Sequence, residues 1–197
     1  IDLPGEATGQ VDSPLLRKKL HAEHPEAYPY SSYYPADNVE MAFGQGETLV
    51  TPIQMADAYA TFANGGTRYQ PEVVGDIVSP TGKIVRKIAP KVLGKVHYAP
   101  GTYSAMLSGF ENAVQWEKGT AYGAFAGFDL TRWNVAGKTG TATVTNDPNA
   151  QPTSWFVAFG GPRGQTPRYV VAVEIDQAGY GADAAAPVAR QVFDYLY

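Results

Sequence analysis

A run of large apolar and β-branched residues near the end of the chain constrains the fold more than any other feature. The run Ser154-Trp-Phe-Val-Ala-Phe159 has the composition of a strand that is buried on both faces. A turn over residues 160–167 leads to a further strand over 168–176. A closing helix from about Ala184 carries apolar residues on one stripe. The sequence therefore predicts a sheet near the end of the chain and a helix with an apolar side.

Three helices are expected upstream of this sheet. The first covers residues 14–21, where three leucines lie near one stripe. The second begins at Pro52, a residue that suits the first turn of a helix, and ends before Asn64-Gly65-Gly66. The third lies near residues 101–116, where apolar residues recur at helical spacing. We interpret the second of these helices as core scaffold.

The segments between the helices carry turn signals. Residues 72–88 predict a β-hairpin, with aliphatic residues on both sides of Pro80-Thr-Gly82. Residues 28–35 are expected to form a proline-bounded, tyrosine-rich loop, and residues 145–152 a polar loop. A glycine-punctuated stretch after the third helix leads into the most informative strand of the chain.

That strand is Val135-Ala-Gly-Lys-Thr-Gly-Thr-Ala-Thr143, which combines strand propensity with the chemistry of anion recognition. A glycine between two threonines suits a strand whose edge is approached closely by another element or by a ligand. Lys138 offers a point charge with three donors, and Thr139 and Thr141 offer donors to a carboxylate or an oxyanion. Alternation places Lys138 and Gly140 on one side of the strand and the two threonines on the other.

The run Lys138-Thr-Gly-Thr141 resembles the third motif of the penicillin-binding proteins and serine β-lactamases, where it lies beside a nucleophilic serine. Further blocks extend the resemblance over most of the chain and are most similar to the class B, monofunctional penicillin-binding proteins of the elongation type. These blocks are Ile1-Asp-Leu-Pro-Gly-Glu-Ala-Thr-Gly9, Ala42-Phe-Gly-Gln-Gly46, Thr51-Pro-Ile-Gln54, Ala58-Tyr-Ala60 and Ala63-Asn-Gly-Gly66. The resemblance implies an α+β fold of the penicillin-recognising, β-lactamase-like kind, of which residues 1–197 form the C-terminal portion with three antiparallel strands plus helices.

The upstream motifs of that family are missing. Its nucleophile lies in Ser-x-x-Lys, followed by Ser-x-Asn, and both precede Lys-Thr-Gly. No Ser or Thr here has a lysine three residues later, and no Ser has an asparagine two residues later. We therefore expect residues 1–197 to be the C-terminal part of one transpeptidase domain whose nucleophile lies elsewhere. Because loss of the nucleophile costs about a millionfold in turnover in serine hydrolases, this segment alone is expected to be inactive.

The resemblance also implies roles for the residues of the motif. Lys138 and Thr141 take catalytic roles: the Lys138 ammonium supports proton movement around the serine, and the Thr141 backbone N–H is one oxyanion donor. Lys138, Thr139, Gly140 and Thr141 bind the substrate carboxylate, with Gly140 leaving space for a facing helix. Trp155 is expected to belong to the core instead, because a large aromatic residue on a central strand is usually packed there.

The implied activity is that of a D,D-transpeptidase, which cross-links peptidoglycan stem peptides through a serine acyl-enzyme and is inhibited by β-lactam antibiotics. No metal or organic cofactor is implied. The implied partners are stem peptides, β-lactams, the upstream part of the domain and a membrane glycosyltransferase of the wall-elongation machinery. The implied location is the outer face of the bacterial cytoplasmic membrane, with an anchor upstream. Two rivals remain: a β-lactamase or β-lactam sensor, and a non-catalytic peptidoglycan-binding scaffold.

Composition and spacing exclude several other functions. A net charge of −4 argues against a dedicated nucleic-acid surface, and the absence of cysteine excludes disulfides and thiolate metal sites. A phosphate-binding loop needs a glycine five residues before Gly137, where the chain has Arg132. His21, Glu23 and His24 do not have the spacing of a His-Glu-x-x-His zinc site. No apolar run approaches the roughly 18 residues of a membrane span.

Overall fold

The computed structural model describes residues 1, 3–143, 147 and 149–197. The chain divides into two compact units, each described here by itself. The larger unit comprises Ile1–Glu6 and Pro52–Tyr197, and the smaller unit comprises Ala7–Thr51. Thr145, Asn146 and Pro148 of the predicted polar loop lie outside the described residues.

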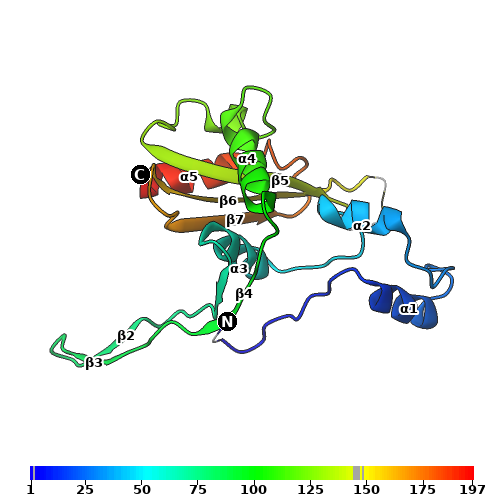
Figure 1. Cartoon of the computed structure of the whole chain (residues 1–197), viewed down its shortest axis with the longest axis horizontal. Coiled ribbons are helices and arrows are strands. Elements are labelled where there is room, and N and C mark those ends of the chain that lie inside the picture. The colour runs from blue at the N-terminus through cyan, green and yellow to red at the C-terminus, as the bar shows by residue number, and fades with distance from the viewer. Residues whose placement is uncertain (2, 144–146, 148) are drawn as a thin grey trace. The chain divides into compact units, whose positions relative to one another are not determined.

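The larger unit is built on an antiparallel sheet of three strands in the order β5-β6-β7 (Figure 1). The strands are β5 (Trp133–Ala142), β6 (Thr153–Pro162) and β7 (Tyr169–Ile175). The register pairs Lys138 with Val157 and Gly140 with Trp155. The sheet predicted from the sequence is therefore confirmed. The central strand β6 is longer than the predicted run 154–159, because it pairs along its whole length with β5.

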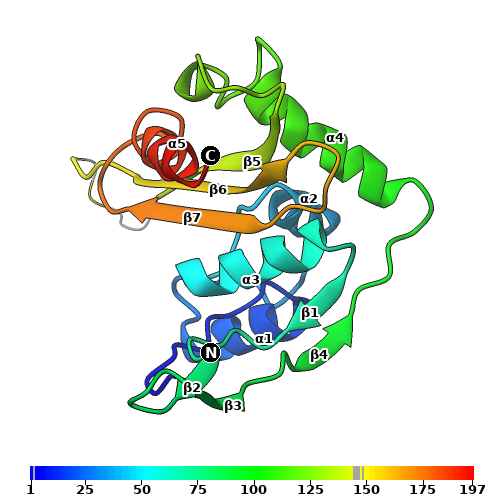
Figure 2. The ribbon, with the colours of Figure 1, turned by 90° about the vertical axis from the view of Figure 1, so that its left-hand side faces the viewer.

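One face of the sheet is covered by α5 (Ala185–Leu196), which packs on β6 and β7 (Figure 2). Alanines let this helix approach closely, and Phe193 fills the space between it and the strands. Phe156 of β6 and Phe125 of η1 (Gly123–Phe125) pack beside it. The ring centroid of Phe125 lies 5.8 Å from that of Phe156 and 6.2 Å from that of Phe193. This cluster is the main core of the unit.

The opposite face is covered by α3 (Pro52–Ala63) (Figure 2). Phe62 is the centre of an aromatic cluster there, with its ring 5.8 Å from that of Phe159 and 5.2 Å from that of Phe110. Phe110 belongs to α4 (Thr102–Gln115), so the cluster joins both helices to the sheet. Tyr59 packs against Phe110 and Phe159 in the same cluster, and burial raises the pKa of its hydroxyl to about 12.

The end of α4 is attached to the start of β5 by polar side chains. Gln115 Nε2 donates to Asn134 Oδ1 at 2.6 Å and to the Val135 carbonyl at 2.9 Å. Asn134 Nδ2 donates in turn to Glu111 Oε1, and Arg163 Nη2 donates to Gln115 Oε1. These contacts fix α4 along the beginning of β5.

Four short strands lie between α3 and α4. The strands β1 (Thr67–Tyr69) and β4 (Val92–Lys95) form one antiparallel pair, and β2 (Asp76–Val78) and β3 (Ile84–Lys87) form another. The second pair is the predicted hairpin, and it extends away from the three-stranded sheet (Figure 1). The first pair was not predicted, because its strands are short and are separated by the whole hairpin.

The smaller unit holds α1 (Pro14–Glu23) and α2 (Pro35–Ala42). Ser13 caps α1 by accepting a hydrogen bond from the Leu16 N–H, and the predicted helix over 14–21 is confirmed. Gln10 and Leu49 exchange backbone hydrogen bonds and bring the ends of the unit together. The helix α2 was not predicted; Pro35 occupies its first turn, and the Asp37 carboxylate accepts the Tyr34 N–H.

Among the described residues, none of the helices is both long and apolar enough for a membrane span. The helices predicted at Pro52 and near 101–116 are confirmed as α3 and α4, and the closing helix as α5. The expected α+β fold class is confirmed.

Candidate functional site

The motif Lys138-Thr-Gly-Thr141 lies in the second half of β5, at the margin of the sheet. In the described part of the chain only β6 pairs with β5, so the outer edge of β5 is not paired with another strand. Backbone N–H and C=O groups on such an edge are available to an extended peptide. The predicted strand at a sheet edge is therefore confirmed.

Alternation along β5 divides the motif between the two faces of the sheet. Val135 belongs to the core beneath α5, and Ala136 belongs to the aromatic cluster beneath α3. Thr139 and Thr141 follow Val135 by even steps and share its side, whereas Lys138 and Gly140 share the side of Ala136. The four residues thus present donors on both sides of one edge.

Lys138 is exposed, in contrast to the buried residues that precede it on β5. Its Nζ donates to the carbonyl oxygen of Thr139 at 2.7 Å. This contact holds the ammonium beside the strand and leaves two of its three N–H donors for other acceptors. The position fits a cation that receives an anionic group at the strand edge.

The hydroxyl of Thr139 lies 2.9 Å from the hydroxyl of Thr120. Thr120 precedes η1, in a loop that the backbone of Gly119 holds against the end of α4. A Cβ at Gly119 would lie 2.2 Å from the Asn112 carbonyl oxygen, so only glycine fits there. The loop thereby places a second hydroxyl next to the motif.

Gly140 is packed closely by its cross-strand neighbour. A Cβ at Gly140 would lie 2.9 Å from the Cβ of Trp155, closer than side chains tolerate. The neighbour that requires glycine here is Trp155 of β6, and the expectation that Gly140 leaves space for a facing helix stays a prediction. Trp155 was expected to belong to the core, and the structure shows it half-buried.

A second glycine approaches the same pair from the loop before α5. A Cβ at Gly181 would lie 2.5 Å from the Gly140 carbonyl oxygen and 2.3 Å from that of Trp155. The backbone of this loop therefore lies directly against the backbone of the motif. The loop is held by Ser154, whose fully buried hydroxyl donates to the Tyr180 carbonyl and accepts from the Ala185 N–H.

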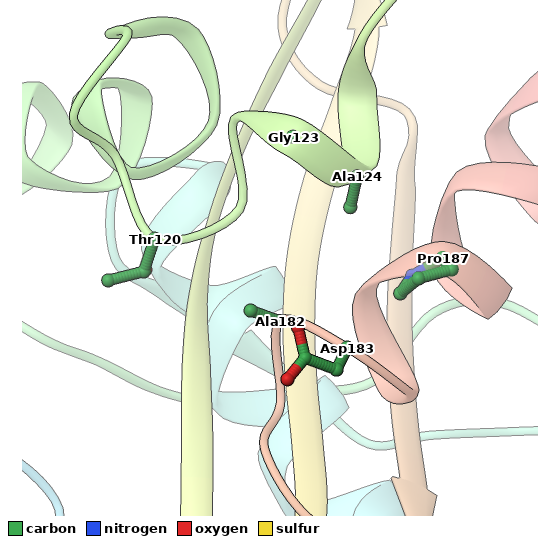
Figure 3. Close-up of a pocket in the computed structure, with 6 residues that line it drawn as sticks. All are labelled: Thr120, Gly123, Ala124, Ala182, Asp183 and Pro187. Atoms are coloured by element: carbon green, nitrogen blue, oxygen red, sulfur yellow. The ribbon is translucent and has the colours of Figure 1, made fainter.

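A pocket of about 370 Å³ opens beside these two loops (Figure 3). Thr120, Gly123 and Ala124 line it from one side, and Ala182, Asp183 and Pro187 line it from the other. Asp183 is the charged residue of this lining. Thr120, one of these lining residues, also makes the hydroxyl contact with Thr139. In the part of the chain that the structure describes, no group of three or more potential metal ligands is present.

Sequence reasoning identified the motif but not the residues that support it. Thr120 was seen only as part of a glycine-punctuated stretch, and Ser154 only as the first residue of a strand. The spacing Gly119-Thr120 before the motif and the pair Gly179 and Gly181 before α5 were the available signals. They mark loops that approach a strand closely, but they do not say which strand.

The chain matches one family model over nearly its whole length. The family is described as "Penicillin binding protein transpeptidase domain", and the match covers residues 1–194.

Two curated relatives illustrate the match. The chain is 37% identical over 169 residues to penicillin-binding protein 1A of Neisseria meningitidis serogroup B, which covers 80% of this chain and 19% of that protein. It is 30% identical over 198 residues to stage V sporulation protein D of Bacillus subtilis, which covers 98% of this chain and 27% of that protein. The chain therefore spans less than a third of the length of either relative.

Solved structures agree with the sequence match. Penicillin-binding protein 2 of Pseudomonas aeruginosa, in complex with WCK 5153, superimposes with a TM-score of 0.72 at 25% identity, over 99% of this chain and 38% of that one. Penicillin-binding protein A of M. tuberculosis, as its imipenem acyl-enzyme complex, superimposes with a TM-score of 0.62 at 26% identity, over 80% of this chain and 33% of that one. With its edge strand, its covering helices and a family match from residue 1 to residue 194, the chain belongs to the family of penicillin-binding protein transpeptidase domains.

Proposed function

We propose that this chain is the C-terminal part of a peptidoglycan D,D-transpeptidase domain. The observation that carries the proposal is the position of Lys138-Thr-Gly-Thr141 on an unpaired sheet edge, within a chain that the transpeptidase family matches over residues 1–194. Both compact units belong to one domain in this proposal. The upstream part of the domain supplies the nucleophilic serine.

The proposed reaction is an acyl transfer in two steps. The serine attacks the carbonyl carbon between the two terminal D-alanines of a stem peptide, and the terminal D-alanine leaves after it takes a proton. An amine of a second stem peptide then attacks the acyl-enzyme, which releases the serine and forms the cross-link. β-Lactams acylate the same serine. The imipenem acyl-enzyme of the M. tuberculosis relative supports this step for the family.

The motif residues have separate roles in these steps. Lys138 and the hydroxyl of Thr139 bind the terminal carboxylate of the donor peptide, because both present donors at the strand edge. Lys138 also supports proton movement around the serine. The backbone N–H of Thr141 donates to the oxyanion. Gly140 lets β5 and β6 pack closely, because a Cβ there would meet that of Trp155.

We assign the parent protein to class B, in the elongation-type group. The matches to stage V sporulation protein D and to penicillin-binding protein 2 support this assignment because they cover 98% and 99% of the chain. The match to penicillin-binding protein 1A is higher in identity but covers 80%. In this proposal the parent is anchored by an upstream segment, works outside the cytoplasmic membrane and has a membrane glycosyltransferase as a partner.

The test uses a fluorescent penicillin on the intact parent protein. We expect a stable covalent adduct on the parent and none on residues 1–197 alone, because the nucleophile is elsewhere. Lys138→Ala in the parent should lower the acylation rate about a hundred- to a thousandfold, the usual effect of removing one donor to the reacting groups. Lys118→Ala is the matched control, since Lys118 is exposed and lies over the ring of Trp116.

Each outcome distinguishes the proposal from its rivals. Rapid turnover of the penicillin by the parent would indicate a β-lactamase instead. If no serine of the parent forms an adduct, the protein is a scaffold without catalysis. Equal acylation of Lys138→Ala and Lys118→Ala would show that the motif lysine does not act in the reaction.

A further inference from the structure

A basic lobe of the larger unit has no core of its own. We define the basic lobe as residues 74–97, which contain β2, β3 and β4. Every residue of the basic lobe is exposed except Ser79, Ile88 and Gly94. Aliphatic side chains are exposed throughout it, including Ile77, Val78, Ile84, Val85, Val92 and Leu93. Since a two-stranded hairpin is marginally stable in water unless a face of it packs on something, this lobe is suited to a covering surface.

Cations outnumber carboxylates in the basic lobe, where Asp76 is the one acidic residue. Five of the 15 Lys and Arg residues of the chain lie in it, and no acidic residue occurs between Asp76 and Glu111. The five cations are Lys83, Arg86, Lys87, Lys91 and Lys95. Within the described residues, none of these five takes part in an ion pair. The lobe is therefore positive in a chain whose formal net charge is −4.

Basic and aliphatic residues are mixed along the strands rather than segregated. Ile77 pairs with Arg86 and Asp76 pairs with Lys87 across the hairpin, while Val78 pairs with Ile84. Lysine stems can lie along an apolar surface while their ammonium groups remain among anions. The turn at Ser79–Lys83 is polar and internally hydrogen-bonded. The arrangement suits contact along the side of the hairpin, not insertion of its tip.

The composition of the basic lobe distinguishes between an acidic protein and an anionic lipid surface as its partner. Protein interfaces are enriched in aromatic residues and arginine and depleted in lysine. The basic lobe has four lysines and one arginine, and it contains no Phe, Trp or Tyr. Anionic lipid headgroups over an apolar layer need only clustered cations and exposed aliphatic side chains. We propose that the basic lobe binds the surface of a lipid bilayer that carries anionic headgroups.

The test measures binding of the purified chain to lipid vesicles. Because the chain has no cysteine, Val85→Cys allows a single environment-sensitive fluorophore to be attached in the lobe, at a side chain that is 68% exposed. Tyr195→Cys, at a position on α5 that is 90% exposed, is the matched control. The probes are vesicles of phosphatidylcholine with phosphatidylglycerol and vesicles of phosphatidylcholine alone. We expect a blue shift only for the label at 85 and only with phosphatidylglycerol.

Two kinds of variant separate charge from apolar contact. The triple variant Lys83→Gln, Lys87→Gln and Lys91→Gln should weaken partitioning roughly 100-fold, at about fivefold for each cation. The variant Ile77→Ser with Ile84→Ser should remove the blue shift while some electrostatic binding remains. Raising the salt concentration to about 1 M, where the Debye length falls to roughly 3 Å, should release the chain. All five positions are exposed, so their replacement does not disturb the core.

Three outcomes would overturn the proposal. One is equal binding to both kinds of vesicle. Another is a blue shift for the label at 195 rather than at 85. The third is binding to soluble polyglutamate as tight as that to phosphatidylglycerol vesicles, without a blue shift at 85, which would indicate an acidic protein segment as the partner.

Discussion

A single hydroxyl contact connects the motif to a loop nineteen positions earlier in the chain. Thr120 and Thr139 share one hydrogen bond of 2.9 Å, and neither hydroxyl has another side-chain partner among the hydrogen bonds of the described residues. In the proposed function, Thr139 faces the substrate carboxylate. Thr120 is then a positioning residue, because it fixes the rotamer of Thr139 without touching the reacting atoms.

Replacement of Thr120 tests this role. Thr120→Val keeps the shape of the side chain and removes its hydroxyl, so the acylation rate constant should fall about fivefold, the equivalent of one hydrogen bond. Thr120→Ser keeps the hydroxyl and should retain the wild-type rate. The measurement is the second-order rate of acylation of the parent by a fluorescent penicillin, with the melting temperature as the control for folding. Equal rates for the Val and Ser variants would contradict the role.

The close packing around Gly140 predicts that any side chain at this position lowers stability. In Gly140→Ala the new Cβ would meet the Cβ of Trp155 at 2.9 Å, and the strands would have to separate. We expect the free energy of unfolding to fall by about 1–3 kcal/mol, the usual cost of overpacking. Gly94→Ala is the matched strand control, because a Cβ there meets no atom within 4 Å. Denaturant titration of both variants measures the difference, and similar values would refute the packing argument.

At the scale of elements, the helix α4 determines how the motif strand is held. Gln115 is its last residue, and its amide binds Asn134, the Val135 carbonyl and Arg163 at once. These bonds lie a few residues before Lys138 on the same strand. They therefore anchor the beginning of β5 while the motif half of the strand keeps its open edge.

Loss of the Gln115 amide should loosen this anchor. Gln115→Ala leaves the Val135 carbonyl and Asn134 without their donor, which should cost about 1–3 kcal/mol in the free energy of unfolding. Asn112→Ala on the same helix is the control, since the Asn112 amide makes only a long contact of 3.5 Å to Ser108. Hydrogen exchange of β5 amides should increase for the first variant and not for the second. Unchanged exchange would mean that packing alone holds the strand.

The aromatic cluster beneath α3 gives the fold an alkaline limit. Burial raises the pKa of Tyr59 to about 12, above its value of about 10 in the unfolded chain. The neutral phenol is the form that the folded state favours. The contribution of the buried Tyr59 phenol to the free energy of unfolding is therefore fully present below pH 10. It is lost as the pH rises from about 10 toward about 12.

Tyr59→Phe should remove this dependence. The wild-type chain should lose about 2 kcal/mol more of its free energy of unfolding than the variant between pH 9 and pH 12, apart from the effects of the other tyrosines that both share. Denaturant midpoints at several pH values measure the gap. A gap that stays constant with pH would show that Tyr59 ionises as freely in the folded chain as in the unfolded one.

At the scale of the whole molecule, the sequence predicted the strands and long helices because each has a local pattern. The motif strand, β6, β7 and the helices α3, α4 and α5 were all found in this way. The helix α2 was missed because Pro35 was interpreted as a loop boundary, although proline also suits a first helical turn. The pair β1 and β4 was missed because it joins residues 67–69 to residues 92–95, and short strands carry little pattern.

The candidate site was predictable in its chemistry but not in its surroundings. Lys138 and its two threonines were identified from their residue types and spacing. The contact of Thr139 with Thr120 and those of Gly140 with Trp155 and Gly181 depend on strand register and on loop paths, which residue types do not specify. Gly140 illustrates the same limit, because a glycine signals a close neighbour without saying whether that neighbour is a helix or a side chain.

The loop before α5 has a consequence for the order in which the chain acquires its form during synthesis. Gly181 lies against Gly140, and Phe193 fills the core beneath β6. When residues 133–142 leave the ribosome, the loop at Gly181 and the helix α5 have not yet been translated. The nascent motif strand therefore reaches its packed position only after α5 has emerged as well.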